Sequence, residues 1–240
     1  GPDVAAMAGL LEQHRPRLYI TNSAFHNPTG AVLSPLVAHR LLKLAEAHDL
    51  LIVEDDIFGD FEHESAPRLS AFDGLERVIQ VGSFSKTLSA SVRCGYIATQ
   101  PEWCERLVDL KLATSFGNSP FSAEMLFELL RKGSYRRHLD SLRGRLADAM
   151  GETLLRLRAL DIQPWLEPRG GVFVWACLPG GLDAAEVSRA ALADNLVLAP
   201  GNVFSLSQSA TGYLRFNVAQ CLSPRVFQGL ERAMEQARGR

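Results

Sequence analysis

The sequence predicts an α/β protein with a mostly parallel sheet that carries helices on both faces, followed by a smaller α+β domain. In the first half of the 240 residues, continuous apolar runs alternate with segments of helical periodicity, a pattern typical of parallel strands joined by helices. From about Ala123 the sequence becomes predominantly helical, and the strand-like runs that follow are short. We therefore expect two domains, with bounds 1–138 and 139–240, and an interdomain helix over about 135–160.

Local signals define each element of the first half. Ser34 and Pro35 supply an N-cap and a first-turn proline, and the apolar residues that follow recur at helical spacing through about Asp49. The run Leu50–Val53 has no polar interruption, which suits a strand covered on both faces. The expected elements of this half are strands at 17–22, 50–53, 77–82 and 94–99, and a helix that begins at Pro101.

The second half is expected to form an α+β unit with a small sheet. Its last helix has a clear start, because Ser223 and Pro224 again combine an N-cap with a first-turn proline. The other expected elements are strands at 172–177, 196–198 and 213–218, and a helix at 184–194.

Composition and charge exclude several classes of function. The chain is 47% hydrophobic with a mean hydropathy of +0.01, as in ordinary globular proteins, and no apolar run approaches the roughly 20 residues that span a bilayer. A net charge of −2 and a pI near 6.3 indicate that this segment does not bind nucleic acid by itself. The first residues lack the features of a signal peptide, so we expect a cytoplasmic location and no membrane partner.

Cysteine and histidine spacing gives no sign of a metal site. The 4 cysteines form no CxxC pair, and the 6 histidines form neither HxH nor HExxH. We therefore expect no metal and no disulfide framework, and instead free thiols that are buried or half-buried.

Polar residues follow three of the expected strands. In open parallel sheets, ligands bind beyond the carboxyl ends of the strands, so these groups could converge on one crevice. The candidates are Asn27 in Asn-Pro-Thr-Gly, Asp55 in Glu-Asp-Asp, and Lys86 with Ser83, Ser85 and Arg93.

Lys86 directly follows an apolar strand and is flanked by serines. A lysine amine in a partly desolvated site becomes a nucleophile toward an aldehyde. The alternative is a surface lysine on a loop. Ser83, Ser85 and Arg93 offer the hydroxyls and the planar cation that suit a phosphate monoester, although Arg93 could also be an ordinary surface residue.

A carboxylate at the end of a buried strand is costly without a cationic partner, and a protonated pyridine nitrogen is such a partner. The alternative is a helix N-cap, which either Asp55 or Asp56 could provide. We favour Asp55 for the ring and Asp56 for a structural bond. Asn27 can donate from its amide to a phenolate oxygen, and its Asn-Pro-Thr-Gly segment is in any case a turn.

Six motifs occur in order over nearly the whole chain: NPTG, EDDIFGDF, GSFSKTLSASVRCGYIA, PRGGVFVW, APGNVFS and YLRFN. Together they resemble the fold-type I aminotransferases of the class I and II group, which depend on pyridoxal phosphate. The phrases EDDIFGDF, GSFSKTL and GSYRRHLDSLRGRL are similar in more detail to the aminotransferase-like domain of MocR-type (GntR family) transcription regulators.

The resemblance implies that pyridoxal 5′-phosphate is held as an imine on Lys86, and that residues 1–138 are the C-terminal portion of the large cofactor-binding domain. It also implies a homodimer. By the same resemblance, Asp55 pairs with the ring nitrogen and Asn27 contacts the ring oxygen. The phosphate is held by Ser83, Ser85 and Arg93, and Arg215 binds the α-carboxylate of a small amino acid ligand. For Arg215 the alternative is a salt-bridged strand residue.

Two departures from the family pattern bear on activity. The family usually has a tyrosine that hydrogen-bonds the ring phenolate where this chain has Phe58, and losing that donor would cost roughly 1 to 3 kcal/mol. The family's phosphate loop and the aromatic residue that stacks on the ring have no counterpart before Gly1. We therefore expect this segment alone to hold the cofactor weakly, to be inactive, and to expose an apolar sheet edge.

Three functions are compatible with these residues. The first is the effector domain of a MocR-type regulator, which binds pyridoxal phosphate and a small amino acid or amine ligand and has a winged-helix DNA-binding domain upstream. The second is a free-standing amino acid aminotransferase that transfers an amino group to a 2-oxo acid, with Lys86 as the general acid and base. The third is a dimerising scaffold without activity. A basic helix-turn-helix segment of roughly 70 residues upstream would indicate the regulator.

Overall fold

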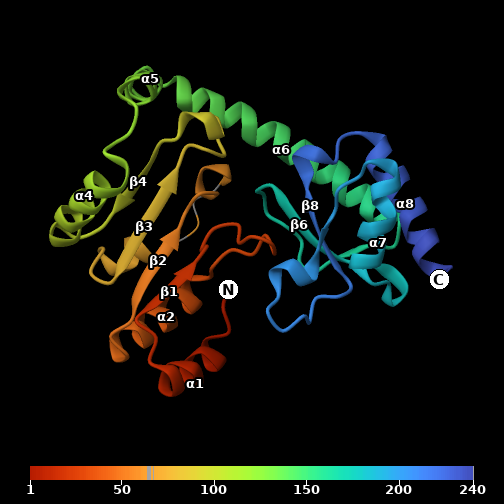
Figure 1. Cartoon of the computed structure of the whole chain (residues 1–240), viewed down its shortest axis with the longest axis horizontal. Helices are drawn as coiled ribbons and strands as arrows, with labels where there is room; N and C mark the ends of the chain where they lie inside the picture. The colour runs from red at the N-terminus through yellow and green to blue at the C-terminus, as the bar shows by residue number, and fades with distance from the viewer. Residues whose placement is uncertain (64–65, 67, 240) are drawn as a thin grey trace. The chain divides into compact units, whose positions relative to one another are not determined.

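The computed structural model describes residues 1–63, 66 and 68–239. The chain divides into two compact units (Figure 1). Unit 1 comprises residues 1–26 and 31–142, and unit 2 comprises residues 27–30 and 143–240. None of the described helices combines the length and the apolar character needed to cross a membrane.

Unit 1 is built on a four-stranded sheet in the order β1-β2-β3-β4. Its strands are β1 (Leu18–Thr21), β2 (Leu51–Asp55), β3 (Val78–Ser83) and β4 (Gly95–Ala98). β1, β2 and β3 are parallel, and β4 runs antiparallel to β3. The helices are α1 (Val4–His14), α2 (Pro35–Ala47), α3 (Leu69–Asp73), α4 (Pro101–Ser115) and α5 (Pro120–Arg131), with 3-10 turns η1 (Gly59–Phe61) and η2 (Ala90–Val92).

The core of unit 1 lies between one face of this sheet and helices α1, α2 and α3. Strand alternation turns Ile52 and Val78 inward, where both are fully buried. The other face carries apolar side chains in the open: Leu18 and Ile20 on β1 are 46% and 66% exposed. The edge strand therefore exposes apolar surface.

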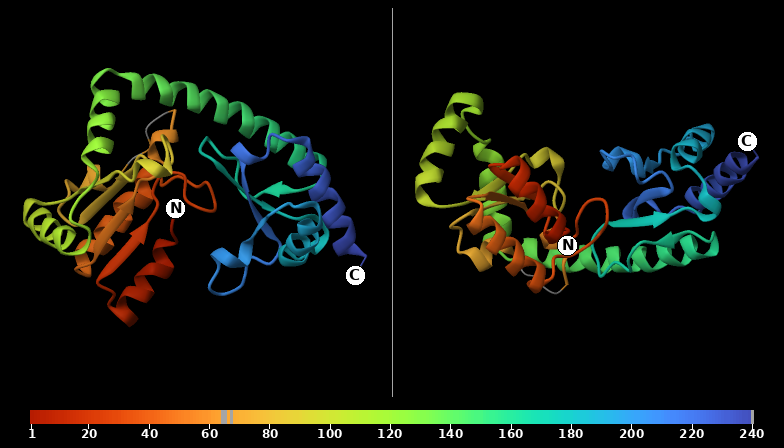
Figure 2. Two further views of the ribbon diagram at one scale, coloured as in Figure 1. Left: turned by 45° about the horizontal axis from the view of Figure 1, so that its top comes forward. Right: turned by 90° about the horizontal axis from the view of Figure 1, so that it is seen from below.

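Unit 2 contains a smaller antiparallel sheet in the order β5-β6-β8-β7. Its strands are β5 (Gln163–Pro164), β6 (Phe173–Cys177), β7 (Ala199–Pro200) and β8 (Tyr213–Asn217). Helices α7 (Ala184–Ala191) and α8 (Pro224–Arg238) pack against each other (Figure 2). The 3-10 turns of this unit are η3 (Pro179–Gly181), η4 (Leu192–Asp194), η5 (Gly201–Phe204) and η6 (Val218–Gln220).

The helix α6 (Ser134–Ala159) has 26 residues and begins in unit 1 and ends in unit 2. Figure 2 shows it as one continuous helix. Its buried side chains recur at helical spacing, so its apolar stripe extends over most of its length. They are Tyr135, Leu139, Leu146, Ala149, Met150, Thr153, Leu154 and Leu157.

Three local predictions need correction. The strand expected at 196–198 lies at Ala199–Pro200 instead, because the Leu196 amide still bonds back to the Ala191 carbonyl, over 3.1 Å, at the end of the preceding helix. That helix ends at Ala191 and continues as a 3-10 turn to Asp194. Cys104 is exposed, whereas we expected buried or half-buried thiols.

Helix α1 has no counterpart among the elements expected from sequence. Its start is nevertheless encoded locally, because the Asp3 carboxylate accepts from the amides of Ala5 and Ala6 at 3.0 Å. Its end is a left-handed Arg15 with φ 47°.

Candidate functional site

The carboxyl ends of three parallel strands meet at one edge of the unit 1 sheet. Asp55 is the last residue of β2 and Ser83 the last of β3, and the register pairs Asp55 with Val81, two residues before Ser83. The Asn22 side chain, directly after β1, donates to the Asp55 carbonyl oxygen over 3.1 Å. Sequence analysis overlooked Asn22 because the expected strand at 17–22 included it, whereas β1 ends at Thr21.

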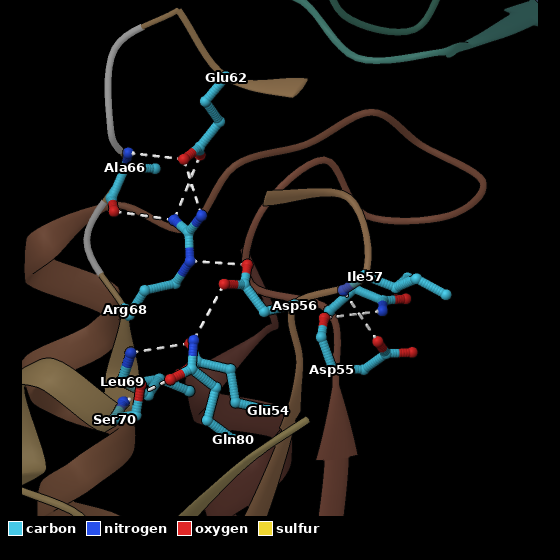
Figure 3. A network of polar contacts seen from close by, with 11 residues as sticks. Glu54, Asp55, Asp56, Ile57, Glu62, Ala66, Arg68, Leu69, Ser70 and Gln80 are labelled. Atoms are coloured by element: carbon cyan, nitrogen blue, oxygen red, sulfur yellow. Dashed lines mark hydrogen bonds and ion pairs between the residues drawn. The ribbon is translucent and has the colours of Figure 1, made fainter. Parts of the chain in front are cut away.

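The adjacent carboxylates of Asp55 and Asp56 point to opposite sides of the chain (Figure 3). Asp56 faces Arg68, whose Nε lies 2.7 Å from its Oδ1, and it accepts from Gln80 Nε2 over 3.0 Å. Asp55 faces away from this cluster, and its Oδ1 accepts from the Ile57 amide over 3.1 Å. No described ion pair engages Asp55, so its carboxylate is left for another cationic partner.

A polar network anchors the segment that follows β2 (Figure 3). Arg68 also binds Glu62, with Nη2 to Oε2 at 2.7 Å, and these side chains are 15% and 5% exposed. The fully buried Glu54 accepts from the amides of Leu69 and Ser70 at 2.8 and 2.9 Å, the free N–H groups at the start of α3. Burial raises the pKa of the Asp56 carboxyl, and the Arg68 guanidinium opposes that effect.

Lys86 lies in a tight turn directly after β3. Ser85 donates from its amide to Ser83 Oγ over 3.1 Å, and Ser83 Oγ lies 2.9 Å from Ser85 Oγ. The Leu88 amide closes the turn on the Phe84 carbonyl over 2.9 Å. The side chain of Lys86 is exposed, which corrects the expectation of a partly desolvated amine: the described residues around it do not cover it.

Arg93 follows η2 and is also exposed, with φ 50°. The next residue, Cys94, accepts through its carbonyl from the Phe84 amide over 3.2 Å, so the backbone at Arg93 runs beside the Lys86 turn. The two serine hydroxyls, the exposed amine and the exposed guanidinium form a donor set that suits an anion such as a phosphate ester.

Arg215 and Asn27 form a second group, within unit 2. Arg215 lies on β8, and its Nη1 donates to Asn27 Oδ1 over 2.8 Å. The guanidinium carbon lies 4.5 Å from the ring centre of Phe173 and 4.8 Å from that of Phe204. Burial lowers the pKa of Arg215, and its Nε is buried without a hydrogen-bond partner.

This arrangement bears on the two interpretations of Arg215. A salt-bridged strand residue would have an acidic neighbour, and among the residues that the structure describes no carboxylate pairs with Arg215. A half-buried guanidinium between two aromatic rings, with a free donor, is suited to a ligand carboxylate.

The predicted site residues thus fall into two sets. Asp55, Ser83, Ser85 and Lys86 share the carboxyl edge of the unit 1 sheet, with Arg93 next to them along the backbone. Asn27 pairs with Arg215 in unit 2. Convergence of the two sets on one ligand stays a prediction.

Phe58 lies just before η1 and is 6% exposed, with its ring stacked at 6.3 Å on that of Phe61. Its hydrocarbon ring offers no hydroxyl donor. The described residues contain no cluster of three or more histidine, cysteine, aspartate or glutamate side chains placed to hold a metal ion.

Comparison with known proteins identifies the fold. The 2-aminoadipate transaminase of Thermus thermophilus is 32% identical over 100% of this chain and 62% of its own length. The crystal structure of LysN, the α-aminoadipate aminotransferase of the same species, complexed with N-(5′-phosphopyridoxyl)-L-leucine, superposes with a TM-score of 0.88 at 29% identity and covers 100% of this chain and 64% of that one.

The uncharacterized HTH-type transcriptional regulator YisV of Bacillus subtilis is 31% identical over 84% of this chain and 43% of its own length. The match therefore spans about two-fifths of the length of the regulator and three-fifths of that of the transaminase. The chain has the pyridoxal-phosphate-dependent transferase fold over the part of that fold that it covers. Because residues 1–232 match the profile described as aminotransferase class I and II, this chain belongs to the class I and II aminotransferase family.

Proposed function

We propose that this chain is the pyridoxal-phosphate-binding effector domain of a MocR-type transcription regulator, with the cofactor attached to Lys86. The observation that carries this proposal is the carboxyl edge of the unit 1 sheet. There β2 ends in a carboxylate that no described ion pair engages, and an amine and two hydroxyls lie at the end of β3. The family to which the chain belongs supports the choice of cofactor.

The residues present fit pyridoxal phosphate. Asp55 has no cationic partner among the described residues, and its carboxylate points away from the Arg68 network (Figure 3). It is therefore suited to hold the proton of a pyridine nitrogen. Ser83, Ser85 and Arg93 supply donors and a cation for the phosphate.

Pyridoxal phosphate, when bound, supplies an aldehyde that condenses with primary amines and a ring that withdraws electrons from the adduct. The chain contributes attachment, orientation and charge. Lys86 carries the cofactor through Nζ, Asp55 keeps the ring nitrogen protonated, and the Asn27 amide donates to the ring oxygen.

Arg215 recognises the α-carboxylate of a small amino acid ligand in this proposal. The free Nε and the aromatic neighbours Phe173 and Phe204 support this role. Asn27 holds the guanidinium from the other side, through the bond to Nη1. The fork geometry of a guanidinium matches a carboxylate in two parallel hydrogen bonds.

One observation favours a sensor over an enzyme: Phe58 lacks the hydroxyl donor that would tune the ring oxygen for efficient proton transfer. The similarity to YisV, an HTH-type regulator, is compatible with a sensor. An amine ligand bound at this site would change the conformational equilibrium of the protein if it binds the two states differently. The DNA-binding domain of the regulator lies upstream of this chain, and the protein is a cytoplasmic homodimer.

The second candidate is a free-standing amino acid aminotransferase, in which Lys86 moves the proton at the ligand's α-carbon. The similarity to the Thermus 2-aminoadipate transaminase favours it. The complete coding sequence separates the two candidates, because only the regulator has a basic helix-turn-helix segment upstream.

The cofactor site is tested by Lys86→Ala in the full-length protein. We expect the visible absorption band of the attached cofactor in the unmodified protein and its loss in Lys86→Ala, with an unchanged far-ultraviolet circular dichroism spectrum. The matched control is Lys43→Ala, because Lys43 is an exposed lysine on α2 that pairs with Glu46. A band that survives Lys86→Ala removes Lys86 from its proposed role.

A further inference from the structure

Thr87, the residue directly after Lys86, is held by two side chains from the start of α6. Its side-chain Oγ1 lies 2.8 Å from the Tyr135 hydroxyl, and its carbonyl oxygen lies 2.7 Å from His138 Nε2. Tyr135 and His138 are three residues apart and so face the same side of the helix. Thr87 and Tyr135 are 2% and 8% exposed, so their hydroxyl–hydroxyl bond is made where water offers little replacement, whereas the bond from the exposed His138 is part-buried.

The direction of each bond follows from its chemistry. A tyrosine hydroxyl has one proton, and Tyr135 donates it to the Asp60 carboxylate, which when ionised can only accept. The Thr87 hydroxyl must then be the donor to Tyr135. The carbonyl of Thr87 can only accept, so His138 carries a proton on Nε2.

These bonds connect three segments that are far apart in sequence. Thr87 and Tyr135 are 48 residues apart, and Tyr135 and Asp60 are 75 apart. Asp60 lies in η1, a few residues after Asp55. The chain of hydrogen bonds therefore ties the turn that bears Lys86 to the segment that follows Asp55 and to α6.

Aromatic packing on Tyr135 also supports the same turn. The ring of Phe84 meets that of Tyr135 edge to face, with centres 5.5 Å apart. The Phe84 amide is bonded to the Cys94 carbonyl, and its carbonyl accepts from Leu88. The residues on both sides of Lys86 are thus fixed, whereas Lys86 itself is exposed.

We propose that Tyr135 and His138 are positioning residues, which hold the backbone of the Lys86 turn in register with the segment that bears Asp55. The inference rests on the proposed role of Lys86 as the attachment point. An exposed lysine side chain has many rotamers, so the placement of its amine depends on how firmly the backbone beneath it is held. A displacement of about 1 Å between reacting groups lowers reaction rates strongly.

The first test measures the turn without cofactor, by amide hydrogen exchange of Leu88 in the cofactor-free full-length protein. Tyr135→Phe removes the hydroxyl and keeps the ring, and we expect it to accelerate exchange about three- to tenfold, the equivalent of one lost hydrogen bond. Thr87→Val should act in the same way, and Thr87→Ser should retain slow exchange. Tyr19→Phe is the control, since Tyr19 packs on the unit 1 core outside this network.

The second test measures orientation, by the visible circular dichroism per bound cofactor. That signal depends on a fixed geometry between the cofactor and the protein, whereas absorbance reports attachment alone. We expect Tyr135→Phe and Thr87→Val to retain the absorption band and to lose at least half of the dichroism, and Thr87→Ser and Tyr19→Phe to retain both.

Each failure has a distinct pattern. If Leu88 exchange is the same in Tyr135→Phe and in Tyr19→Phe, the network does not hold the turn and the inference is wrong. If exchange rises but dichroism is unchanged, the network is merely structural and the positioning role is overturned. A band that survives Lys86→Ala instead contradicts the proposed function, and the exchange measurement remains valid because it is made without cofactor.

Discussion

The Arg215 guanidinium donates from Nη1 to Asn27 Oδ1 over 2.8 Å, which joins residues 188 positions apart in the chain. Asn27 lies in the short segment 27–30 that belongs to unit 2, while the residues on both sides of it belong to unit 1. Gly30, at the end of that segment, also lies close to the rest of unit 2, because a Cβ on Gly30 would lie 3.1 Å from the Phe173 carbonyl oxygen. Gly30 has φ 70°, a conformation that glycine adopts without strain.

Arg215→Lys tests whether this guanidinium binds a carboxylate. Lysine keeps the charge and loses the fork, so we expect amino acid affinity to fall about ten- to a hundredfold, with the affinity for simple amines unchanged. Spectral titration of the full-length protein with each ligand class measures both. Arg189→Lys is the control, since Arg189 is exposed on α7 and pairs with Glu186. Equal losses for amino acids and amines would contradict the assignment.

Asp55→Asn and Asp56→Asn should affect different properties of the protein, because the two carboxylates face opposite sides (Figure 3). Asn at position 55 cannot hold the proton of a ring nitrogen, so we expect the cofactor band to persist and its reaction with amino acids to slow at least tenfold. Asn at position 56 weakens the bond to Arg68, so we expect a loss of about 1 to 3 kcal/mol in the free energy of unfolding. Stopped-flow absorbance and urea titration of both variants measure these effects. The reverse pattern would exchange the roles of the two residues.

Phe58→Tyr introduces the hydroxyl donor that the family usually has. If the ring oxygen of the cofactor lies within its reach, the added hydrogen bond should accelerate half-transamination with amino acids up to about tenfold. Single-turnover kinetics of the full-length protein measure the rate. Phe72→Tyr, at a position that is 56% exposed on α3, controls for the added hydroxyl. An unchanged rate would mean that the donor is supplied elsewhere or is irrelevant.

Local sequence signals were sufficient for most strands and helices. The runs at Leu50–Val53 and 77–82 correspond to β2 and β3, and the cap at Ser34 begins α2, where the Ser34 hydroxyl accepts from the Val37 amide. The strand at 196–198 was misplaced because its apolar residues suit either a strand or a helix end, and the bond from Leu196 to Ala191 decides between them. Such competition depends on tertiary context.

The site was predictable only in part, for a physical reason. Asp55, Ser83 and Lys86 each follow a strand, and the parallel sheet places strand ends together. The contacts of Arg68 with Asp56, and of Tyr135 with Asp60, join segments whose spacing in space depends on the packing of α3 and α6. The apolar periodicity of a single segment does not indicate which distant segments pack together, so these contacts could not be predicted from the sequence.

Cys221 provides a test of burial in unit 2 that is independent of the cofactor. Its side chain is 4% exposed, and burial raises the pKa of its thiol from 9.0 to about 11. A thiol is nucleophilic only as the thiolate. At pH 8 we therefore expect iodoacetamide to modify Cys221 at least a hundredfold more slowly than Cys104, which is exposed. Mass spectrometry of the native protein measures both rates, and comparable rates would contradict the packing around Cys221.

The same shift predicts how stability depends on pH. The folded pKa lies above the unfolded one, so the unfolded state loses its proton first as pH rises, and unfolding becomes easier. The contribution of the protonated Cys221 thiol to the free energy of unfolding is complete below pH 9 and is lost between pH 9 and about 11. The loss reaches at most about 2 to 3 kcal/mol for a pKa shift of this size. Urea titrations across this range measure it. Other groups also titrate there, so the informative quantity is the difference from Cys221→Ala, which lacks the thiol. We expect that difference to shrink as pH rises toward 11, and two parallel pH profiles would show that the Cys221 thiol titrates alike in the folded and unfolded states.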